Sequence, residues 1–454
     1  MLAKRVRLVR WAHRDGLLGR HLKMDHERHV APNRIARPSF VASVERLASW
    51  RRRSSVERFT RALGEQVIAA WRRCDLRRTA FADVARDQLT AVQGQSLPSA
   101  NALLEWAIAG ESLPYQQHFD SPFGQPSVTL FWHSQFYIEA LFWTSATPAV
   151  HNHSFHGAFS VLAGSSLQTT YDFIPHDVVN EQLTLGSVQV RDARVLGVGS
   201  VERILPGRDL IHSVFHLDSP SVTLVVRTHS DPNTAGRFEY LIPSVAFDPT
   251  IVDQQRTRRL QCLALLAETD PARYVAQAKD LIRGTDFVTV FCVLRQAWGH
   301  SGHGIYQAEL SADAKIRWGD RIDSLDRAFA EERRRTPGAI RRKVSDRTLR
   351  IFVGVLLSQC SRRSIGTVLA DNLPDHATPD AIAEMVRQLG AVGALPIDID
   401  ELSGRVIAAV ISRDACDEAS VVAALCGLGG AAGQEIKGRL RELKEVPLLR
   451  PMFS

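Results

Sequence analysis

The pattern of apolar and polar positions divides the chain into three parts. From about residue 41 to 109, apolar side chains recur at helical spacing. Between about 125 and 248, short runs rich in Val, Thr, Phe and Ser are separated by turn residues, which is typical of antiparallel strands. After Pro249 the helical spacing returns. The pattern predicts an α+β chain, in which a central β unit lies between N-terminal helices and a larger C-terminal helical unit.

The central unit is predicted to form a roll of two packed antiparallel sheets, because it offers enough short strands for one. The interior of such a roll is a natural cavity for a small ligand. The strands are expected at 127–132, 136–143, 149–154, 157–162, 166–173, 185–190, 194–197, 201–205, 211–217, 221–228 and 237–242.

Capping signals place several helices. Ser54 with Glu57 is a capping box, and Asp270 stands before a proline that suits the first turn of a helix. Helices are expected at 99–109, 270–282, 285–298, 346–360, 379–390, 400–412, 417–427 and 431–444. The Arg-rich run 333–343 reads as a linker or exposed loop. The predicted domains are a basic arm (1–40), a helical region (41–120), the β-roll (121–250) and a helical domain (251–454) that divides near 333–345.

Composition narrows the class of protein. A length of 454 residues fits two or three domains. The six cysteines at 74, 262, 292, 360, 416 and 426 form no CxxC pair, so neither a zinc ribbon nor a disulfide framework is indicated. No apolar run approaches the roughly 20 residues that span a bilayer, and no secretory signal is visible. A cytoplasmic protein is expected.

The positive charge is concentrated at the N-terminus. Residues 1–60 hold fifteen Lys/Arg and five Asp/Glu, while the whole chain has a net charge of only +7. Such a segment can contact nucleic acid, an anionic membrane or an acidic partner. A solvated arm is the interpretation we favour, because no aromatic platform or recognition fold accompanies the arginines. A nucleic-acid partner is therefore not expected, although the arm leaves that alternative open.

Three histidines stand out as metal ligands. His151 and His153 are separated by one residue, so on a strand both side chains project from the same face. His212 follows a Pro206-Gly207 turn about sixty residues later, and a β-rich run comes after it. Imidazole suits Zn, Cu, Fe and Ni. Taken alone, each of these residues could instead be a hydrogen-bonded core histidine or a surface histidine.

This order of residues resembles the cupin family over about residues 120–250. The family's first motif is His-x-His, then Glu, then Gly, and here Gly157 stands at the Glu position and Gly164 follows. The second motif, with Gly, Pro-x-Gly, His and Asn, is matched loosely, with two spacings one residue longer. Its counterparts in this chain are Gly199, Pro206, Gly207, His212 and His216, the last in the Asn place.

Within the cupins the chain is most similar to the cysteine-dioxygenase type, which holds Fe(II) with three histidines and no carboxylate. The resemblance implies His151, His153 and His212 as ligands and dioxygen as co-substrate. The chain departs from that group because no cysteine lies near Phe159, and Arg227 stands about where a catalytic histidine falls. Cysteine is therefore not expected as the substrate.

Other residues are candidates for chemistry in the roll. If Arg227 points inward, it can bind a carboxylate or phosphate with two hydrogen bonds. Glu139 needs a partner in an apolar strand, and Tyr171 is a weaker candidate to line the cavity. His156 and His216 are candidates to contact a ligand histidine or to replace one, with core or surface packing as the alternative. His300 and His303, in WGHSGHG, lack a nearby acidic or cysteine partner and favour a flexible loop.

The favoured function is a non-haem Fe(II) oxygenase, thiol dioxygenase-like, that acts on a small-molecule or carrier-bound substrate. A homodimer is the one assembly considered for it. One alternative is a redox-neutral isomerase or lyase that uses Zn(II) or Ni(II). The other is a cupin without catalysis, in which the helical domain binds a partner. No phosphate-binding loop, dinucleotide glycine pattern, nucleophile elbow or HExxH motif is present, which argues against those reaction classes.

Overall fold

The computed structural model describes residues 55–454, apart from 96, 111, 118–123, 145–148, 232–233, 235, 300–303, 336–339, 414–416 and 427–431. The predicted basic arm, the Ser54 cap, and His300 with His303 lie outside the described residues. No helix in the described part combines the length and the apolar character needed to cross a membrane.

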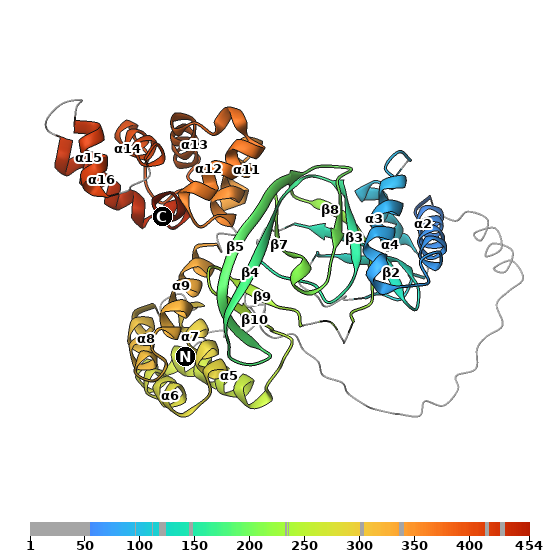
Figure 1. Cartoon of the computed structure of the whole chain (residues 1–454), viewed down its shortest axis with the longest axis horizontal. Helices are drawn as coiled ribbons and strands as arrows, with labels where there is room; N and C mark the ends of the chain where they lie inside the picture. The colour runs from blue at the N-terminus through green and yellow to red at the C-terminus, as the bar shows by residue number, and fades with distance from the viewer. Residues whose placement is uncertain are drawn as a thin grey trace, which may run out of the picture.

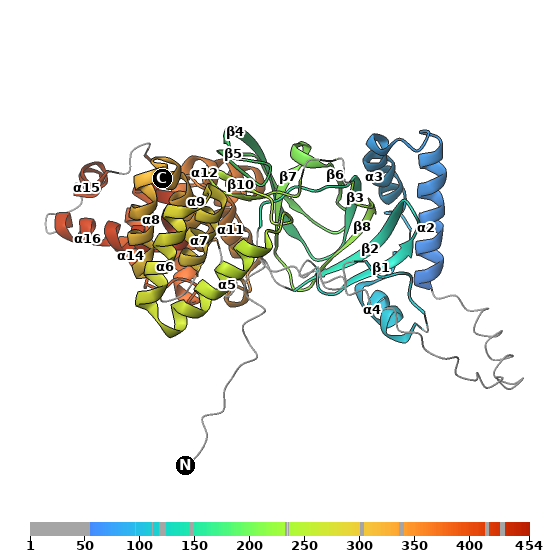
Figure 2. The same ribbon diagram turned by 90° about the horizontal axis from the view of Figure 1, so that it is seen from below.

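Two antiparallel five-stranded sheets form the centre of the molecule (Figure 1). Sheet A has the order β1-β2-β8-β3-β6, and sheet B has the order β7-β4-β5-β10-β9. Helices flank the sheets at both sides (Figure 2). The predicted fold class, an α+β chain with a cupin-like double-stranded β-roll between N- and C-terminal helices, is confirmed. The strands are β1 (Ser127–Trp132), β2 (Phe136–Trp143), β3 (Gly157–Ala163), β4 (Ser166–Val178), β5 (Leu183–Leu196), β6 (Val201–Ile204), β7 (Ile211–His216), β8 (Ser221–Thr228), β9 (Glu239–Leu241) and β10 (Val245–Phe247).

The N-terminal helices cover the outer face of sheet A. They are α2 (Ser55–Arg72), α3 (Phe81–Ala91) and α4 (Ala100–Ala109). The ring of Trp71 meets the ring of Phe136 in β2 edge to face, with a centroid distance of 6.5 Å. The ring of Phe81 is tilted against the same Phe136 ring at 5.6 Å. Ile138 and Val226 belong to the same buried cluster. Because strand side chains alternate, the intervening residues of β2 and β8 face the interior of the roll.

Two further helical cores contact sheet B. The first joins the helices α5 (Gln254–Thr269), α6 (Pro271–Gly284), α7 (Phe287–Gly299), α8 (Gly304–Trp318) and α9 (Arg321–Arg334) to β5, β9 and β10. The second contacts β4, β5 and β7. It contains α10 (Ile340–Lys343), α11 (Arg347–Ser358), α12 (Arg362–Asn372), α13 (Pro379–Ala391), α14 (Glu401–Ile411), α15 (Glu418–Cys426), α16 (Ala432–Glu445) and the 3₁₀ segment Pro447–Phe453.

Polar contacts also join the helices to sheet B. The Asn372 side chain donates to Ala193 O at 2.8 Å and accepts from Val195 N at 2.9 Å, which satisfies main-chain groups of β5. Arg321 of α9 pairs with Asp177 of β4 at 2.7 Å. Packing and hydrogen bonding therefore both fix the helical units against the sheet.

Several predicted elements differ from the structure. The expected strands 185–190 and 194–197 are one strand, β5, because both pair with the equally long β4. The expected strand 149–154 makes only single bridges, at His151 and His153. The strand β10 and the helices α5, α8, α9 and α12 were not among the expected elements. The run 333–343 is not a plain linker in its described part, since α9 ends at Arg334, α10 covers Ile340–Lys343, and Arg341 is buried.

The contact between α11 and sheet B generates a stability prediction. A Cβ atom added at Gly354 would lie 2.8 Å from Phe215 Cδ1 and 3.1 Å from a methyl carbon of Leu167. Gly354→Ala is therefore expected to destabilise the fold by about 1–3 kcal/mol through overpacking. At Gly366 in α12 an added Cβ meets nothing within 4 Å, so Gly366→Ala should stabilise by up to about 1 kcal/mol. Urea unfolding of both variants measures the difference, and equal effects would contradict the packing argument.

Candidate metal centre

The segment that carries His151 and His153 lies between the two edge strands of sheet B. His151 pairs with His212 of β7 on one side and with Glu239 of β9 on the other. The main-chain amides of His151 and His212 each donate to the carbonyl of the other, at 2.9 Å. His153 bridges to Pro206, and its carbonyl accepts from Gly207 N at 2.8 Å. These pairings bring three histidines together, although they are up to 61 residues apart in the sequence.

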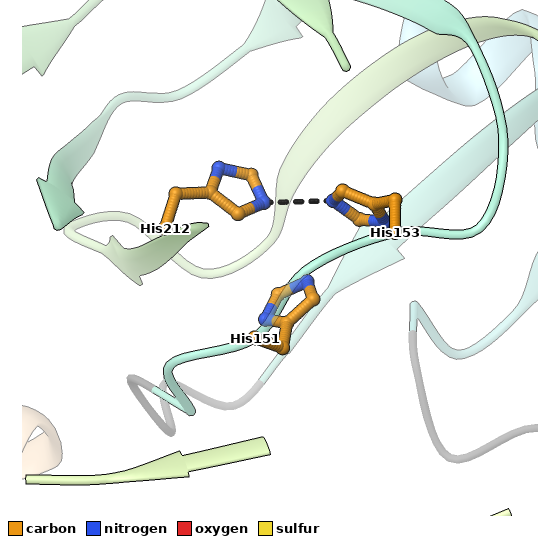
Figure 3. A group of neighbouring side chains, drawn as sticks. All are labelled: His151, His153 and His212. Carbon is orange, nitrogen blue, oxygen red and sulfur yellow. Dashed lines mark hydrogen bonds between the residues drawn. The ribbon is translucent and has the colours of Figure 1, made fainter. Parts of the chain in front are cut away.

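The three imidazoles converge on one point (Figure 3). The potential ligand atoms of His151, His153 and His212 all lie within 4.8 Å of one another. His153 Nε2 and His212 Nε2 are 2.9 Å apart. Two nitrogens that bind one metal at right angles, each at about 2.1 Å, are separated by about 3 Å. The spacing of this pair therefore fits two adjacent ligands of a single ion.

The protonation state of the cluster also fits a metal. Burial lowers the pKa of His151 below its usual value and lowers the pKa values of His153 and His212 much further. The charge of His151 lowers the pKa values of His153 and His212 further, and the charge of His212 adds to the effect at His153. The imidazoles are therefore neutral near pH 7, which is the form that binds metals. His151 Nδ1 lies 3.1 Å from Ala149 O, and this contact orients the imidazole ring.

Arg227 and Glu139 meet inside the roll, beside this cluster. Arg227 Nη1 donates to Glu139 Oε1 at 3.4 Å, and the two side chains are only 14% and 2% exposed. The guanidinium carbon lies 3.3 Å from the centre of the Phe155 ring and 5.2 Å from that of Tyr137. The Phe155 ring in turn lies 4.8 Å from the ring of His153. The ring of Phe155 therefore lies between the Arg227 guanidinium and the ring of His153.

The charges of this pair oppose the effect of burial. Burial raises the pKa of Glu139, and Arg227 holds it down. Burial likewise lowers the pKa of Arg227, while Tyr137 and Glu139 raise it. The Nε atom of Arg227 is buried and has no hydrogen-bond partner among the described residues. The guanidinium thus retains a donor for a further acceptor.

Tyr171 lies on the opposite face of sheet B from His212. Thr170 is the register partner of His212, and Tyr171 is that of Ile211. The Tyr171 hydroxyl contacts Ser213 Oγ at 3.1 Å and donates to Ser358 O at 3.5 Å, where α11 ends. The structure thus brings Arg227 and Glu139 to the histidines and places Tyr171 at the contact with the C-terminal helices.

His156 and His216 are not part of the three-histidine group. Burial and the charge of Arg78 lower the pKa of His156, and its backbone amide donates to Thr228 Oγ1 at 3.2 Å. The His216 ring stacks on Trp143 at a centroid distance of 4.5 Å. Its Nδ1 lies 3.0 and 2.7 Å from the hydroxyls of Ser166 and Ser221. His216 therefore packs in a separate polar cluster at the other end of β7.

Sequence reasoning missed three residues near the histidines. Asn152 is buried, and its side chain accepts from Phe238 N at 2.8 Å and donates to the Tyr240 hydroxyl at 3.3 Å. Glu239 pairs with His151 through the main chain. The exposed Arg237 adds positive charge that lowers the pKa of His151 and His153. Of these three residues, only Asn152 could have been found from the sequence, because it stands between the two histidines. Glu239 and Arg237 come close to the histidines only through tertiary pairing.

No protein-family model and no curated protein matches the chain. Among solved structures, one similar chain is hydroquinone 1,2-dioxygenase from Sphingomonas sp. TTNP3 with 4-hydroxybenzoate bound (13% identity, 28% of this chain and 72% of that chain, TM-score 0.18). Another comes from the DMSP lyases RdDddP and RnDddQII (14% identity, 37% and 94%, TM-score 0.20). A third is an oxalate oxidase (15% identity, 33% and 65%, TM-score 0.16). The strand order and the register of the two sheets define the β-roll.

The buried His216 predicts a pH-dependent stability. Burial, aided by Arg341, lowers the pKa of His216 to about 3. Since an unfolded histidine titrates near 6.5, the unfolded state binds more protons as the pH falls below that value, and stability is lost. The loss at pH 5 is expected to be about 2 kcal/mol. His216→Phe keeps a ring against Trp143 and removes the titration. Urea unfolding at pH 8 and pH 5 should show a smaller loss in the variant, and equal losses would refute the assignment.

The Arg227–Glu139 pair predicts strong coupling between the two residues. Arg227→Met leaves the Glu139 carboxylate buried and uncompensated, which is expected to destabilise the fold by about 3–5 kcal/mol. Replacing both residues, with Arg227→Met and Glu139→Leu, should recover most of this loss because no buried charge remains. A double-mutant cycle on the free energy of unfolding measures the coupling. Additive single effects would show that the two side chains do not depend on each other.

Proposed function

We propose that this chain is a metal-dependent cupin oxygenase, in which His151, His153 and His212 hold a non-haem Fe(II) ion. The observation that carries the proposal is the convergence of three neutral imidazoles, with His153 Nε2 and His212 Nε2 2.9 Å apart. When bound, the metal supplies open coordination positions at which a substrate and dioxygen meet. A set of neutral nitrogen ligands leaves the full positive charge of the ion at the site.

The described cluster contains no carboxylate, so the proposed metal site has three histidine ligands and not a mixed ligand set. Two carboxylates beside the histidine segment, Glu139 and Glu239, are each engaged by an arginine. Glu139 pairs with Arg227 at 3.4 Å, and Glu239 pairs with Arg295 of α7 at 3.5 Å. Neither carboxylate belongs to the described group of potential ligands. This arrangement agrees with the three-histidine type of cupin that the sequence resembles.

The surrounding residues suggest how a substrate is held. Arg227 has a buried Nε donor without a partner among the described residues, and it lies flat against Phe155. We infer that it orients a small-molecule or carrier-bound substrate through an anionic group. Phe155 and Tyr137 are buried beside it and exclude water from that group. Under this proposal Glu139 fixes the Arg227 guanidinium in place.

Metal analysis tests the proposal. The native full chain, purified without an affinity tag and loaded with Fe(II) under anaerobic conditions, is expected to hold about one iron per chain. His151→Ala and His212→Ala remove one ligand each and should lose nearly all of it. His176→Ala is the matched control, since His176 is exposed on β4 and lies outside the histidine group. It should retain the native iron content.

The outcomes separate the alternatives. Iron lost only in the two ligand variants supports the site, and oxygen uptake by the iron-loaded protein with a panel of small thiols and carboxylates then tests the reaction. Preferential retention of zinc or nickel at the same histidines would replace the oxygenase by a redox-neutral isomerase or lyase. A native chain that binds no metal would overturn the proposal and leave a cupin that acts by binding alone.

A further inference from the structure

Three charged side chains connect the C-terminal helices to the strand beside His151. Arg295 of α7 donates from Nε to Glu332 Oε2 of α9 at 3.1 Å, and its Nη2 bonds the other oxygen of Glu332. The same Nη2 lies 3.5 Å from Glu239 Oε2 of β9. We call this group, Arg295 with Glu332 and Glu239, the Arg295 clamp. It ties two helices and one strand together through a single guanidinium.

Arg295 is the most buried member of the clamp and the cation that both carboxylates contact. The Arg295 side chain is 12% exposed, and Glu239 and Glu332 are about one-third exposed. Burial raises the pKa of Glu239, while Arg295 opposes that rise. Burial alone would lower the pKa of Arg295, but Glu332 and Glu239 raise it overall. Without the guanidinium, the two carboxylates would lose the one cation that contacts both of them.

The strand at Glu239 holds the main chain of the ligand segment directly. Tyr240 N donates to Val150 O at 2.8 Å, and Asn152 N donates to Phe238 O at 3.2 Å. The Asn152 side chain adds its own bonds to Phe238 N and the Tyr240 hydroxyl. His151 lies in the middle of this ladder, opposite Glu239. Any shift of residues 238–240 therefore moves His151 relative to His212.

We propose that Arg295 is a positioning residue for the metal centre, and that the helical unit α5–α9 acts through it to fix His151. This inference rests on the proposed metal-binding function. It gives the C-terminal helices a role that a bare β-roll would lack: they hold one of the two edge strands that flank the ligand segment. Outer residues that orient metal ligands typically change metal affinity by about 10–100-fold when they are replaced.

Cobalt binding tests the inference in the full chain. Co(II) is titrated into metal-free protein, and its d–d absorption bands report both affinity and coordination geometry. Arg295→Met is expected to weaken Co(II) binding by about 10–100-fold and to change the band intensities, because His151 no longer has a fixed position. Arg295→Lys keeps the charge but cannot form the fork to both carboxylates, so an intermediate affinity is expected.

Arg283→Met is the matched control. Arg283 of α6 donates from Nε to both oxygens of Asp313 of α8, at 3.1 Å each, within the same helical unit. Asp313 is nearly buried, with a side chain 6% exposed, so this variant also removes an ion pair from the helical unit. It should retain native Co(II) affinity and native bands, even where its melting temperature falls as far as that of Arg295→Met.

A measurement on metal-free protein separates the clamp from the metal function. Amide hydrogen exchange of peptides that cover 149–153 and 238–240 should accelerate in Arg295→Met and Arg295→Lys and remain native in Arg283→Met. Native exchange together with native Co(II) binding in both Arg295 variants would overturn the inference, as would equal loss of Co(II) affinity in Arg283→Met. If the native chain itself binds no Co(II), the metal function fails and the inference falls with it, whereas failure in the variants alone concerns only the clamp.

Discussion

The arrangement of the molecule depends on one short stretch of main chain, residues 149–153, that lies between β7 and β9. Those two strands are the edges of sheet B, and the segment pairs with both of them. The mutual bonds between His151 and His212, at 2.9 Å, set the two histidines side by side. Main-chain pairing, with side chains added to it, therefore brings the three imidazoles together, and the site is as rigid as the two strands that flank it.

Each flanking strand is in turn held by a different helical core. β7 contributes Phe215 to the core of α11–α16, Leu217 directly after the strand joins the same core, and close contact with α11 requires a glycine at position 354. β9 and β10 contribute Leu241, Val245 and Phe247 to the core of α5–α9. A β-roll alone would leave the outer surfaces of β7, β9 and β10 in water. The two C-terminal units bury them, which stabilises the sheet edges from which the ligand segment is held.

Charged side chains around the histidines are paired with one another. The buried carboxylate of Glu139 is paired with Arg227, the partly exposed carboxylate of Glu239 is paired with Arg295, and burial keeps the imidazoles neutral. The exposed Arg237 adds positive charge from the loop before β9. A divalent ion at the histidines would find no free carboxylate among the described residues nearby. Such a site would attract anionic ligands, which agrees with the proposed contact between Arg227 and an anionic group of a substrate.

The sequence by itself determined the histidine spacing and the α+β order of elements, because the spacing of apolar and polar residues is a local property, but it left open whether Arg227 points into the roll. It did not determine the side of Tyr171, since that depends on the register between β4 and β7, nor the helices α5, α8, α9 and α12. Only the tertiary structure decided that residues 149–153 bridge two sheet edges and that Glu239, Arg295 and Arg237 approach the site. These contacts join segments far apart in the chain, and no local pattern of apolar and polar residues encodes them.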